Sequence, residues 1–267
     1  MNEHIIFDIE TTALDWESFS DSQKEYLLRG AETDEEVEKK KYELALSAPT
    51  SRVICIALQL MVKNESEGGE DEWIMKKRAV LSTSKEYEKT ENSEKKEEIK
   101  LDMGVKDAGA GNVEFGNDEI ICYISTEKKL LEDFWAILRK YPKAVLVSFN
   151  GRAFDAPFLM LRSSLLGVRP SRNLMAGTRY RYPLHIDLAD ELTFFNKTFY
   201  GATRRFNFDF YAHAYGIESP KSKEINGGNV GEFYKSGKTK EIAEYCLGDV
   251  RATWELFLKW NNYLRFI

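Results

Sequence analysis

The chain has 267 residues, of which 43% are hydrophobic, and its formal net charge is −6 at pH 7. This length predicts one large domain, or one domain that carries insertions. Because no stretch approaches the roughly 20 apolar residues that span a bilayer, and no basic leader precedes an apolar run at the N-terminus, we expect no membrane partner and no export. The three cysteines, Cys55, Cys122 and Cys246, lack the paired spacing of a zinc site or a disulfide framework. Reduced thiols in a cytoplasmic protein are therefore expected.

Residues 4–12 predict an opening β-strand with two acids on one face. With a period of two, Ile5, Phe7 and Ile9 share one face. Asp8 and Glu10 share the other face, where two ionised carboxylates about 7 Å apart repel unless a cation lies between them. The alternative is that Glu10 has already left the strand and caps a turn.

A polar arm follows at residues 15–48, with 5 basic and 10 acidic residues between positions 15 and 47. Thr33 and Glu36 have the spacing of a capping box, which predicts a helix after Thr33. Residues 52–60 then predict a second, largely buried strand.

Residues 62–118 predict a charged, partly disordered insertion. Residues 73–81 have the pattern of an extra strand, but residues 84–116 are rich in Glu and Lys and then in Gly. That second composition is typical of a solvated or disordered segment. A strand at 119–124 and a helix around 130–138 are expected next.

Residues 144–149 are a short, continuous apolar run, as expected for a central strand that is covered on both faces. Asp155 lies just beyond this strand, at the predicted start of a helix. An N-cap with Pro157 in the first turn is the alternative to a catalytic role for Asp155.

Residues 184–188 alternate as a further strand that carries His185 and Asp187 on one face. A glycine-rich loop with Lys221 leads into a last helix at about 239–258. Tyr245 and Asp249 lie one turn apart on that helix, away from its apolar stripe. A solvent-exposed polar face is the alternative reading of this pair.

Charge is unevenly distributed along the chain. Residues 139–240 contain 17 basic and 8 acidic residues, a local excess of +9, whereas the chain as a whole is acidic. A basic region of this kind is typical of a polyanion site, although arginines scattered over a solvated surface would give the same count. The arginines that contribute to this excess include Arg162, Arg169, Arg172, Arg179, Arg181, Arg204 and Arg205.

Four acids, Asp8, Glu10, Asp155 and Asp249, stand on three separate predicted elements. Such a set is what a pair of hard divalent cations requires. Three segments that carry these acids, residues 7–12 (Phe-Asp-Ile-Glu-Thr-Thr), 148–159 and 245–250, resemble the three exonuclease motifs of the DEDD 3'-5' exonuclease superfamily. The middle segment, with Asn150 and a Phe-Asp-x-Pro sequence, resembles the proofreading domain of family-B DNA polymerases and the predicted stand-alone exonucleases related to it. Tyr245 lies four residues before Asp249, a spacing that resembles the tyrosine branch of this superfamily. The histidine branch would place a histidine at the position of Glu244.

The resemblance implies an α/β, ribonuclease H-like (DnaQ-like) fold, with a mixed five-stranded sheet flanked by helices and its first three strands antiparallel. It also implies a single exonuclease domain over residues 1–267 that binds two Mg²⁺ or Mn²⁺ ions. Asp8 would bridge both ions, Glu10 and Asp249 would complete the nucleophile side, and Asp155 would serve the second ion. Tyr245 would orient the attacking water, because a phenol with a pKa near 10 is a poor base at neutral pH.

The resemblance further implies substrate contacts around this centre. Thr11, Thr12 and Leu14 would contact the terminal nucleotide. Asn150 and Phe154 would shape the site, although a core role suits Phe154 equally well. Asp187 is expected to position other groups, and Lys221 is a candidate phosphate contact or simply a solvated lysine.

The expected activity is metal-dependent 3'-5' hydrolysis of single-stranded nucleic acid, with DNA favoured. A tyrosine-branch exoribonuclease of the RNase D type is one alternative. The other is a catalytically silent nucleic-acid-binding module, against which the presence of all four acids and the tyrosine argues. Because the chain ends soon after the last motif, we expect no attached polymerase domain, and a separate polymerase or repair protein is a candidate partner.

Overall fold

Seven β-strands form one mixed sheet in the order β4-β5-β3-β2-β1-β6-β7. The computed structural model describes residues 3–64, 72–89, 97–101, 120–218 and 225–265. The strands are β1 (Glu3–Ala13), β2 (Ser51–Asn64), β3 (Glu72–Ser82), β4 (Glu97–Leu101), β5 (Ile120–Ile124), β6 (Val145–Ser148) and β7 (His185–Asp187). The α-helices are α1 (Asp21–Leu28), α2 (Asp34–Glu43), α3 (Glu127–Lys140), α4 (Asp155–Leu165), α5 (Leu188–Glu191), α6 (Phe208–Ala214), α7 (Val230–Lys235) and α8 (Thr239–Tyr263).

Strands β1, β2 and β3 pair antiparallel, and β6 and β7 then continue the sheet parallel to β1. This arrangement confirms the predicted ribonuclease H-like α/β fold with its antiparallel first three strands. The sheet has seven strands rather than five, because β5 pairs with the outer edge of β3 and β4 pairs with β5.

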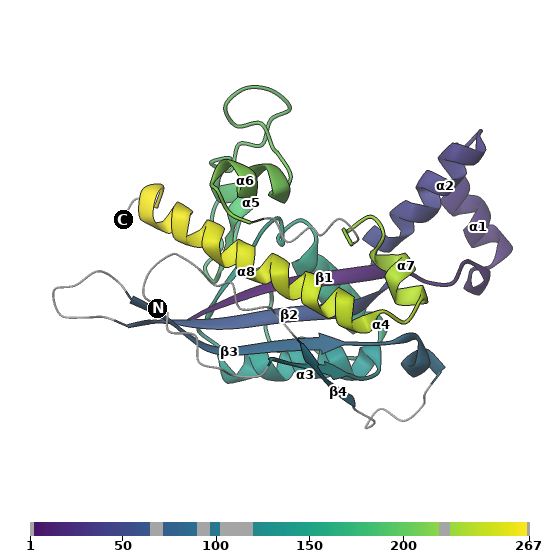
Figure 1. The fold of residues 1–267 in the computed structure, drawn as a ribbon. Helices are drawn as coiled ribbons and strands as arrows, with labels where there is room; N and C mark the ends of the chain where they lie inside the picture. Colours follow the sequence, from purple (N-terminus) through teal and green to yellow (C-terminus); the bar gives the residue numbers. More distant parts are fainter. Residues whose placement is uncertain (1–2, 65–71, 90–96, 102–119, 219–224, 266–267) are drawn as a thin grey trace.

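Helices cover both faces of the sheet, and each face buries its own apolar cluster (Figure 1). Ile5, Phe7 and Ile9 pack with residues of α3 and α4 on one face. Ile6 belongs to the cluster on the opposite face, which α8 covers. The predicted two-residue alternation of β1 is therefore confirmed, and it points Asp8 and Glu10 toward α8.

The acidic arm is helical, as predicted. Thr33 caps α2, and its hydroxyl accepts from the N–H of Glu36 while the Glu36 carboxylate accepts from the N–H of Thr33. A second capping box, of Ser20 and Gln23, begins α1. The two helices project beyond the end of the sheet that carries the C-terminal half of β1 (Figure 1).

The expectation of a solvated or disordered segment at residues 84–116 is wrong in part. A short 3₁₀ helix (Lys85–Lys89) and β4 fall within it, and Tyr87 and Leu101 are buried. β4 forms because alternate residues of this charged stretch, Ile99 and Leu101, are apolar and cover the core at the edge of the sheet. The remainder of that prediction falls on residues 90–96 and 102–116, which lie outside the described part of the chain.

Two arginines counted in the basic region are structural. Arg162 is buried and makes two hydrogen bonds of 2.7 and 2.8 Å to the Glu127 carboxylate. Arg172 donates to the carbonyl of Ala144 at 2.9 Å. Arg162 is therefore not available to a polyanion and Arg172 is only partly exposed, so only part of the local charge excess can serve one. None of the described helices is long and apolar enough to cross a membrane.

Candidate active site

Asp8 and Glu10 stand on the α8 side of β1, close to the end of its pairing with β6. Glu10 remains inside β1, which excludes the alternative in which it caps a turn. The register with β2 shifts between Glu10 and Thr11, a β-bulge of the kind that re-aims neighbouring side chains. Asp8 and Glu10 both precede this shift, so they keep their shared face.

Helix α8 presents a polar stripe to the same place. Tyr245, Asp249 and Thr253 follow one another at steps of four residues, and therefore lie on one side of the helix. The apolar residues on the other side, including Leu247 and Val250, are buried in the core and hold α8 against the sheet. The alternative that Tyr245 and Asp249 belong to a solvent-exposed face is excluded, because Tyr245 is buried and both line a cavity.

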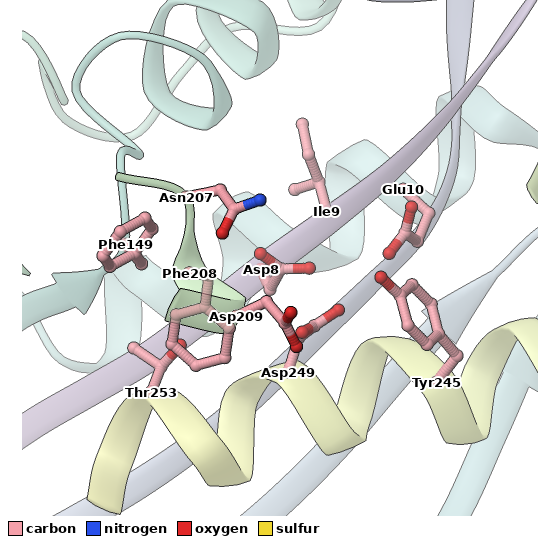
Figure 2. A pocket seen from close by; sticks show the side chains of 10 residues that line it. All are labelled: Asp8, Ile9, Glu10, Phe149, Asn207, Phe208, Asp209, Tyr245, Asp249 and Thr253. Carbon is pink, nitrogen blue, oxygen red and sulfur yellow. The ribbon is translucent and has the colours of Figure 1, made fainter. Parts of the chain in front are cut away.

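A cavity of about 240 Å³ lies between these elements. Figure 2 shows the carboxylates of Asp8 and Glu10 directed from β1 toward Tyr245 and Asp249 on α8. The lining residues are Asp8, Ile9, Glu10, Phe149, Asn207, Phe208, Asp209, Tyr245, Asp249 and Thr253.

Asp155 does not line this cavity, but it contacts Ile9, which does. It is the first residue of α4, and its Oδ1 accepts a hydrogen bond of 3.2 Å from the backbone N–H of Ile9. The N-cap residue of α4 is Phe154, so the predicted alternative of an Asp155 N-cap is excluded. Its charge acts on the cluster, because after burial the repulsion from Asp155 is the largest cause of the raised pKa of Asp8.

Burial in this acidic cluster makes Asp8, Glu10 and Asp155 harder to ionise. Burial, followed by repulsion from Asp155, Asp249 and Glu10, raises the pKa of Asp8 well above its usual range. Burial and then Asp249 do the same to the pKa of Glu10. For Asp155, burial raises the pKa to about 7, even though backbone hydrogen bonds oppose that rise.

The Tyr245 hydroxyl stays protonated in this setting. Burial raises its pKa above the ordinary value of 10, and the negative charges of Asp249, Glu10 and Asp8 raise it further. A neutral phenol can donate one hydrogen bond and accept others. It can therefore orient a polar ligand in the cavity but cannot serve as a base at neutral pH.

The donor set of the cavity suits a hard divalent cation. Four of its ten lining residues, Asp8, Glu10, Asp209 and Asp249, carry carboxylates, and the lining includes no lysine or arginine. Ligand atoms of Asp8, Glu10 and Cys246 lie within 4.8 Å of one another. Burial raises the pKa of the Cys246 thiol, which keeps it protonated, so oxygen atoms remain as the ligands. Carboxylate oxygens are what Mg²⁺ and Mn²⁺ prefer.

Asp209 and its neighbours were not predicted to belong to the site. Asn207 caps α6 by accepting from the N–H of Phe210 at 3.1 Å, and this places Phe208 and Asp209 in the first turn of the helix, at the cavity. An Asn followed by an acid within two residues signals a helix start. That local signal indicates a helix but not that its first turn faces Asp8.

A second, larger cavity of about 650 Å³ adjoins the first, and Ile9 and Glu10 line both. Its wall includes four of the residues predicted to bind substrate: Thr11, Thr12, Leu14 and Phe154. The arm supplies the opposite wall through Trp16, Lys41 and Tyr42.

Three of those four residues also have structural contacts. The Thr11 hydroxyl donates to the carbonyl of Ala45 at 2.7 Å, which ties β1 to the arm. Thr12 is buried, and a Cβ on Gly231 would come within 2.9 Å of its hydroxyl oxygen, so a glycine lets α7 approach β1 here. Phe154 packs against Phe158 with ring centroids 5.5 Å apart, and thus contributes to the core as well as to the cavity.

Asp187 is fully buried and holds the loop that precedes Asp155. It accepts from the N–H groups of Asn150 at 2.8 Å and Arg152 at 2.9 Å, on either side of Gly151. The φ angle of Asn150 is 65°, a left-handed conformation that these bonds help to maintain. Asn150 lines neither cavity; its side chain accepts a hydrogen bond from Arg205. Lys221 lies outside the described residues.

Comparison with known proteins identifies similar sequences. Residues 116–265 match the protein family described as a predicted 3'-5' exonuclease related to the exonuclease domain of PolB. This region carries Asp155, Tyr245 and Asp249 and begins after Asp8 and Glu10.

Archaeal DNA polymerases are among the relatives. DNA polymerase 1 of Saccharolobus solfataricus is 34% identical over 148 residues, which cover 52% of this chain and 16% of that protein. The DNA polymerase of Archaeoglobus fulgidus is 27% identical over 143 residues, 54% of this chain and 16% of that protein. The chain therefore spans less than a fifth of the length of these relatives. The family B DNA polymerase of Pyrobaculum calidifontis has a similar structure, with a TM-score of 0.49 and 18% identity over 98% of this chain and 25% of that one.

Proposed function

Because the chain belongs to the family of predicted 3'-5' exonucleases related to the exonuclease domain of PolB, we propose that it hydrolyses single-stranded DNA from its 3' end. The observation that carries this proposal is the convergence of four acids. Asp8 and Glu10 of β1 and Asp155 of α4 each have a raised pKa, and the charge of Asp249 on α8 contributes to all three rises. Such a cluster is costly to ionise unless cations neutralise it.

Two Mg²⁺ or Mn²⁺ ions fit this cluster. Asp8, Glu10 and Asp249 would hold them from the cavity wall, and Asp155 would act from behind Ile9. Asp155 lies outside the lining and would add its negative charge to the cluster from its position against the Ile9 N–H. When bound, the cations would neutralise negative charge on the scissile phosphate and lower the pKa of the attacking water.

The protein's own side chains then orient the reactants. Tyr245, one turn before Asp249, positions the attacking water through its neutral hydroxyl. Thr253, one turn after Asp249, lines the same side of the cavity and is buried. The Asp187 hydrogen bonds keep the loop before α4 in place, and this keeps Asp155 aligned with Ile9.

The larger cavity is the proposed site of the terminal nucleotide. It begins at Glu10, where the cation cluster ends, and its 650 Å³ falls in the range of small-molecule sites. Thr11, Thr12 and Leu14 would contact the nucleotide from β1. Trp16 and Tyr42 of the arm also line this cavity, and their rings would contact the base.

The test uses 5'-labelled DNA and RNA oligonucleotides of one sequence, incubated with Mg²⁺, with Mn²⁺ or with a chelator. We expect products shortened stepwise from the 3' end, faster on DNA, in the presence of either ion only. Asp8→Asn is the matched inactive variant, because it nearly preserves side-chain volume while weakening both ion sites. Hydrolysis that persists undiminished in excess chelator would contradict the proposal, and faster hydrolysis of RNA would reassign the substrate.

A further inference from the structure

A loop of residues 197–206, here called the aromatic loop, carries exposed rings and leads into α6, whose first turn lines the active-site cavity. It is closed on itself: the N–H of Thr198 donates to the carbonyl of Thr203 at 3.2 Å, and the N–H of Arg205 donates to the carbonyl of Thr198 at 3.2 Å. Gly201 has a φ of 83°, which lets the chain reverse at the tip. The loop therefore has a defined conformation that presents its tip residues to solvent.

Phe199 and Tyr200 stand at that tip almost fully exposed, at 87% and 86%. Phe210, in the first turn of α6, is 62% exposed. A folded protein gains nothing in stability from rings held in water, so adjacent exposed rings on an ordered loop indicate a binding surface.

Ring contacts lead from this surface to the active-site cavity. Phe210 contacts Phe206 at 5.2 Å between centroids, Phe206 contacts Tyr211 at 6.2 Å, and Tyr211 contacts Phe149 at 5.8 Å. Phe149 in turn contacts Phe208 at 5.1 Å, and these last two line the cavity beside Asp8. Figure 2 shows Phe149 and Phe208 at the opposite end of the cavity from Glu10 and Tyr245.

The surface is also positively charged. Residues 194–210 contain Lys197, Arg204 and Arg205 and a single acid, Asp209, which faces the cavity. Lys197 pairs with Asp190, so the exposed Arg204 and Arg205 supply the charge of this surface. The Arg204 guanidinium lies 4.8 Å from the centre of the Phe206 ring. Arg205 donates to the side chain of Asn150, which places its charge at the loop before α4. Interleaved rings and cations are typical of surfaces that bind single-stranded nucleic acid without sequence preference.

We propose that the aromatic loop is a stacking platform for the bases upstream of the scissile linkage. Bases would stack on Phe199, Tyr200 and Phe210, and their phosphates would lie along Arg204 and Arg205. The strand would pass from the loop over Asp8, with its terminal nucleotide in the cavity beyond Glu10. This proposal rests on the proposed function for the identity of its ligand. Charge and the direct path into the acidic cavity favour a nucleic-acid strand over a partner protein.

The first test is binding. In the inactive Asp8→Asn background, with Mg²⁺, the affinity for a fluorescent 12-nucleotide single strand is measured by anisotropy. Phe199→Ala with Tyr200→Ala should weaken binding about 10-fold or more, as expected for lost base stacking. Phe199→Leu with Tyr200→Leu should weaken it almost as much, because apolar area without a ring face does not replace stacking. Tyr200→Phe should bind as the parent does. Tyr26→Ala, an exposed ring on α1, is the matched control.

Salt dependence separates stacking from charge. The double variant Phe199→Ala with Tyr200→Ala, here called the alanine pair, should keep the parental slope of log binding constant against log salt concentration. Losing a stacking contact changes no counterion release. Arg204→Gln should reduce that slope by about 0.7, the value for one phosphate contact on a single strand. Unchanged affinity of the alanine pair would overturn the platform and assign the exposed rings to another partner. If Phe199→Leu with Tyr200→Leu kept the full parental affinity, base stacking would be overturned in favour of simple apolar contact.

A second test keeps this proposal distinct from the proposed function. The p-nitrophenyl ester of thymidine 5'-phosphate is too short to reach the aromatic loop, so the alanine pair should hydrolyse it at the parent rate with all four acids intact. On the 12-nucleotide strand the kcat/KM of the alanine pair should fall about 10-fold, mainly through a rise in KM. If the native protein hydrolyses neither substrate, the proposed function fails and the platform is judged on binding alone. Parental kcat/KM on both substrates would overturn the platform and leave the exonuclease proposal standing.

Discussion

The carboxylate of Asp155 accepts a hydrogen bond of 3.2 Å from the backbone N–H of Ile9, across 146 positions in the chain. Ile9 lies between Asp8 and Glu10, so this one bond aligns the start of α4 with both acids of β1. It is possible because the pairing of β1 with β6 extends only over His4 to Ile6, and Asp155 approaches β1 beyond that point.

Two substitutions of Asp155 should separate this structural bond from metal binding. Asp155→Asn keeps an oxygen that can accept from Ile9, so it should leave the fold intact and remove most of the hydrolysis. Asp155→Ala should in addition lower the free energy of unfolding by about 1 to 3 kcal/mol, because it leaves a buried N–H unsatisfied. Urea unfolding and a 3'-hydrolysis assay measure the two effects. Equal stability of the two variants would show that the bond to Ile9 contributes nothing.

The acidic cluster predicts a metal-dependent and pH-dependent stability. Burial raises the pKa of Asp155 from 3.8 to about 7, so between these values the folded state holds more protons than the unfolded state. The metal-free protein should therefore lose stability as pH rises from about 4 to about 7. If Mg²⁺ or Mn²⁺ binds the ionised cluster as proposed, either ion should raise Tm more at pH 8 than at pH 5.

Differential scanning fluorimetry in chelator and in each ion would measure this dependence. Asp155→Asn should reduce the fall in stability with pH, because it removes one of the titrating carboxyls. An equal rise in Tm at both pH values would show that the ions bind elsewhere than at the cluster.

Tyr245→Phe isolates the role of the phenolic hydroxyl. We expect kcat to fall roughly 10- to 1000-fold, equivalent to about 1.4 to 4 kcal/mol at the transition state, as when one positioned polar contact is lost. Affinities for Mn²⁺ and for DNA should change little, because the hydroxyl is not needed to hold either. Single-turnover kinetics and Mn²⁺ titration measure the two quantities. A variant with normal kcat would make Tyr245 a packing residue of α8.

Asp209 lines the cavity although no sequence motif indicated it, and its role in metal binding can be tested. Its carboxylate lines the cavity from the first turn of α6, so Asp209→Asn should weaken Mn²⁺ binding several-fold and lower kcat/KM about 10-fold. Asp21→Asn is the control, since Asp21 is also an acid in the first turn of a helix but is exposed on the arm. Both variants lose a favourable interaction with a helix dipole, and only Asp209→Asn should affect metal binding. Similar behaviour of the two variants would assign Asp209 to helix capping alone.

Features with a short-range cause could be predicted from the sequence. The two-residue repeat of β1 set the face that Asp8 and Glu10 share, and the four-residue step on α8 set Tyr245 beside Asp249. The capping box at Thr33 and Glu36 likewise marked the start of α2. In each case the spacing of a few consecutive residues determines the direction of their side chains.

The remaining features depend on packing between distant segments. Residues of the arm and of β1 form the larger cavity together, and Asp209 faces Asp8 only because α6 packs against α8. Composition also misjudged β4, whose two apolar residues gain their burial from β5 and α8. Arg162 counted toward a basic region in the sequence, yet Glu127 neutralises it inside the fold. The sequence by itself determined how Asp8, Glu10, Tyr245 and Asp249 are directed from their own elements. Only the tertiary structure decided which of them share a cavity, because burial and charge pairing depend on neighbours that no local spacing specifies.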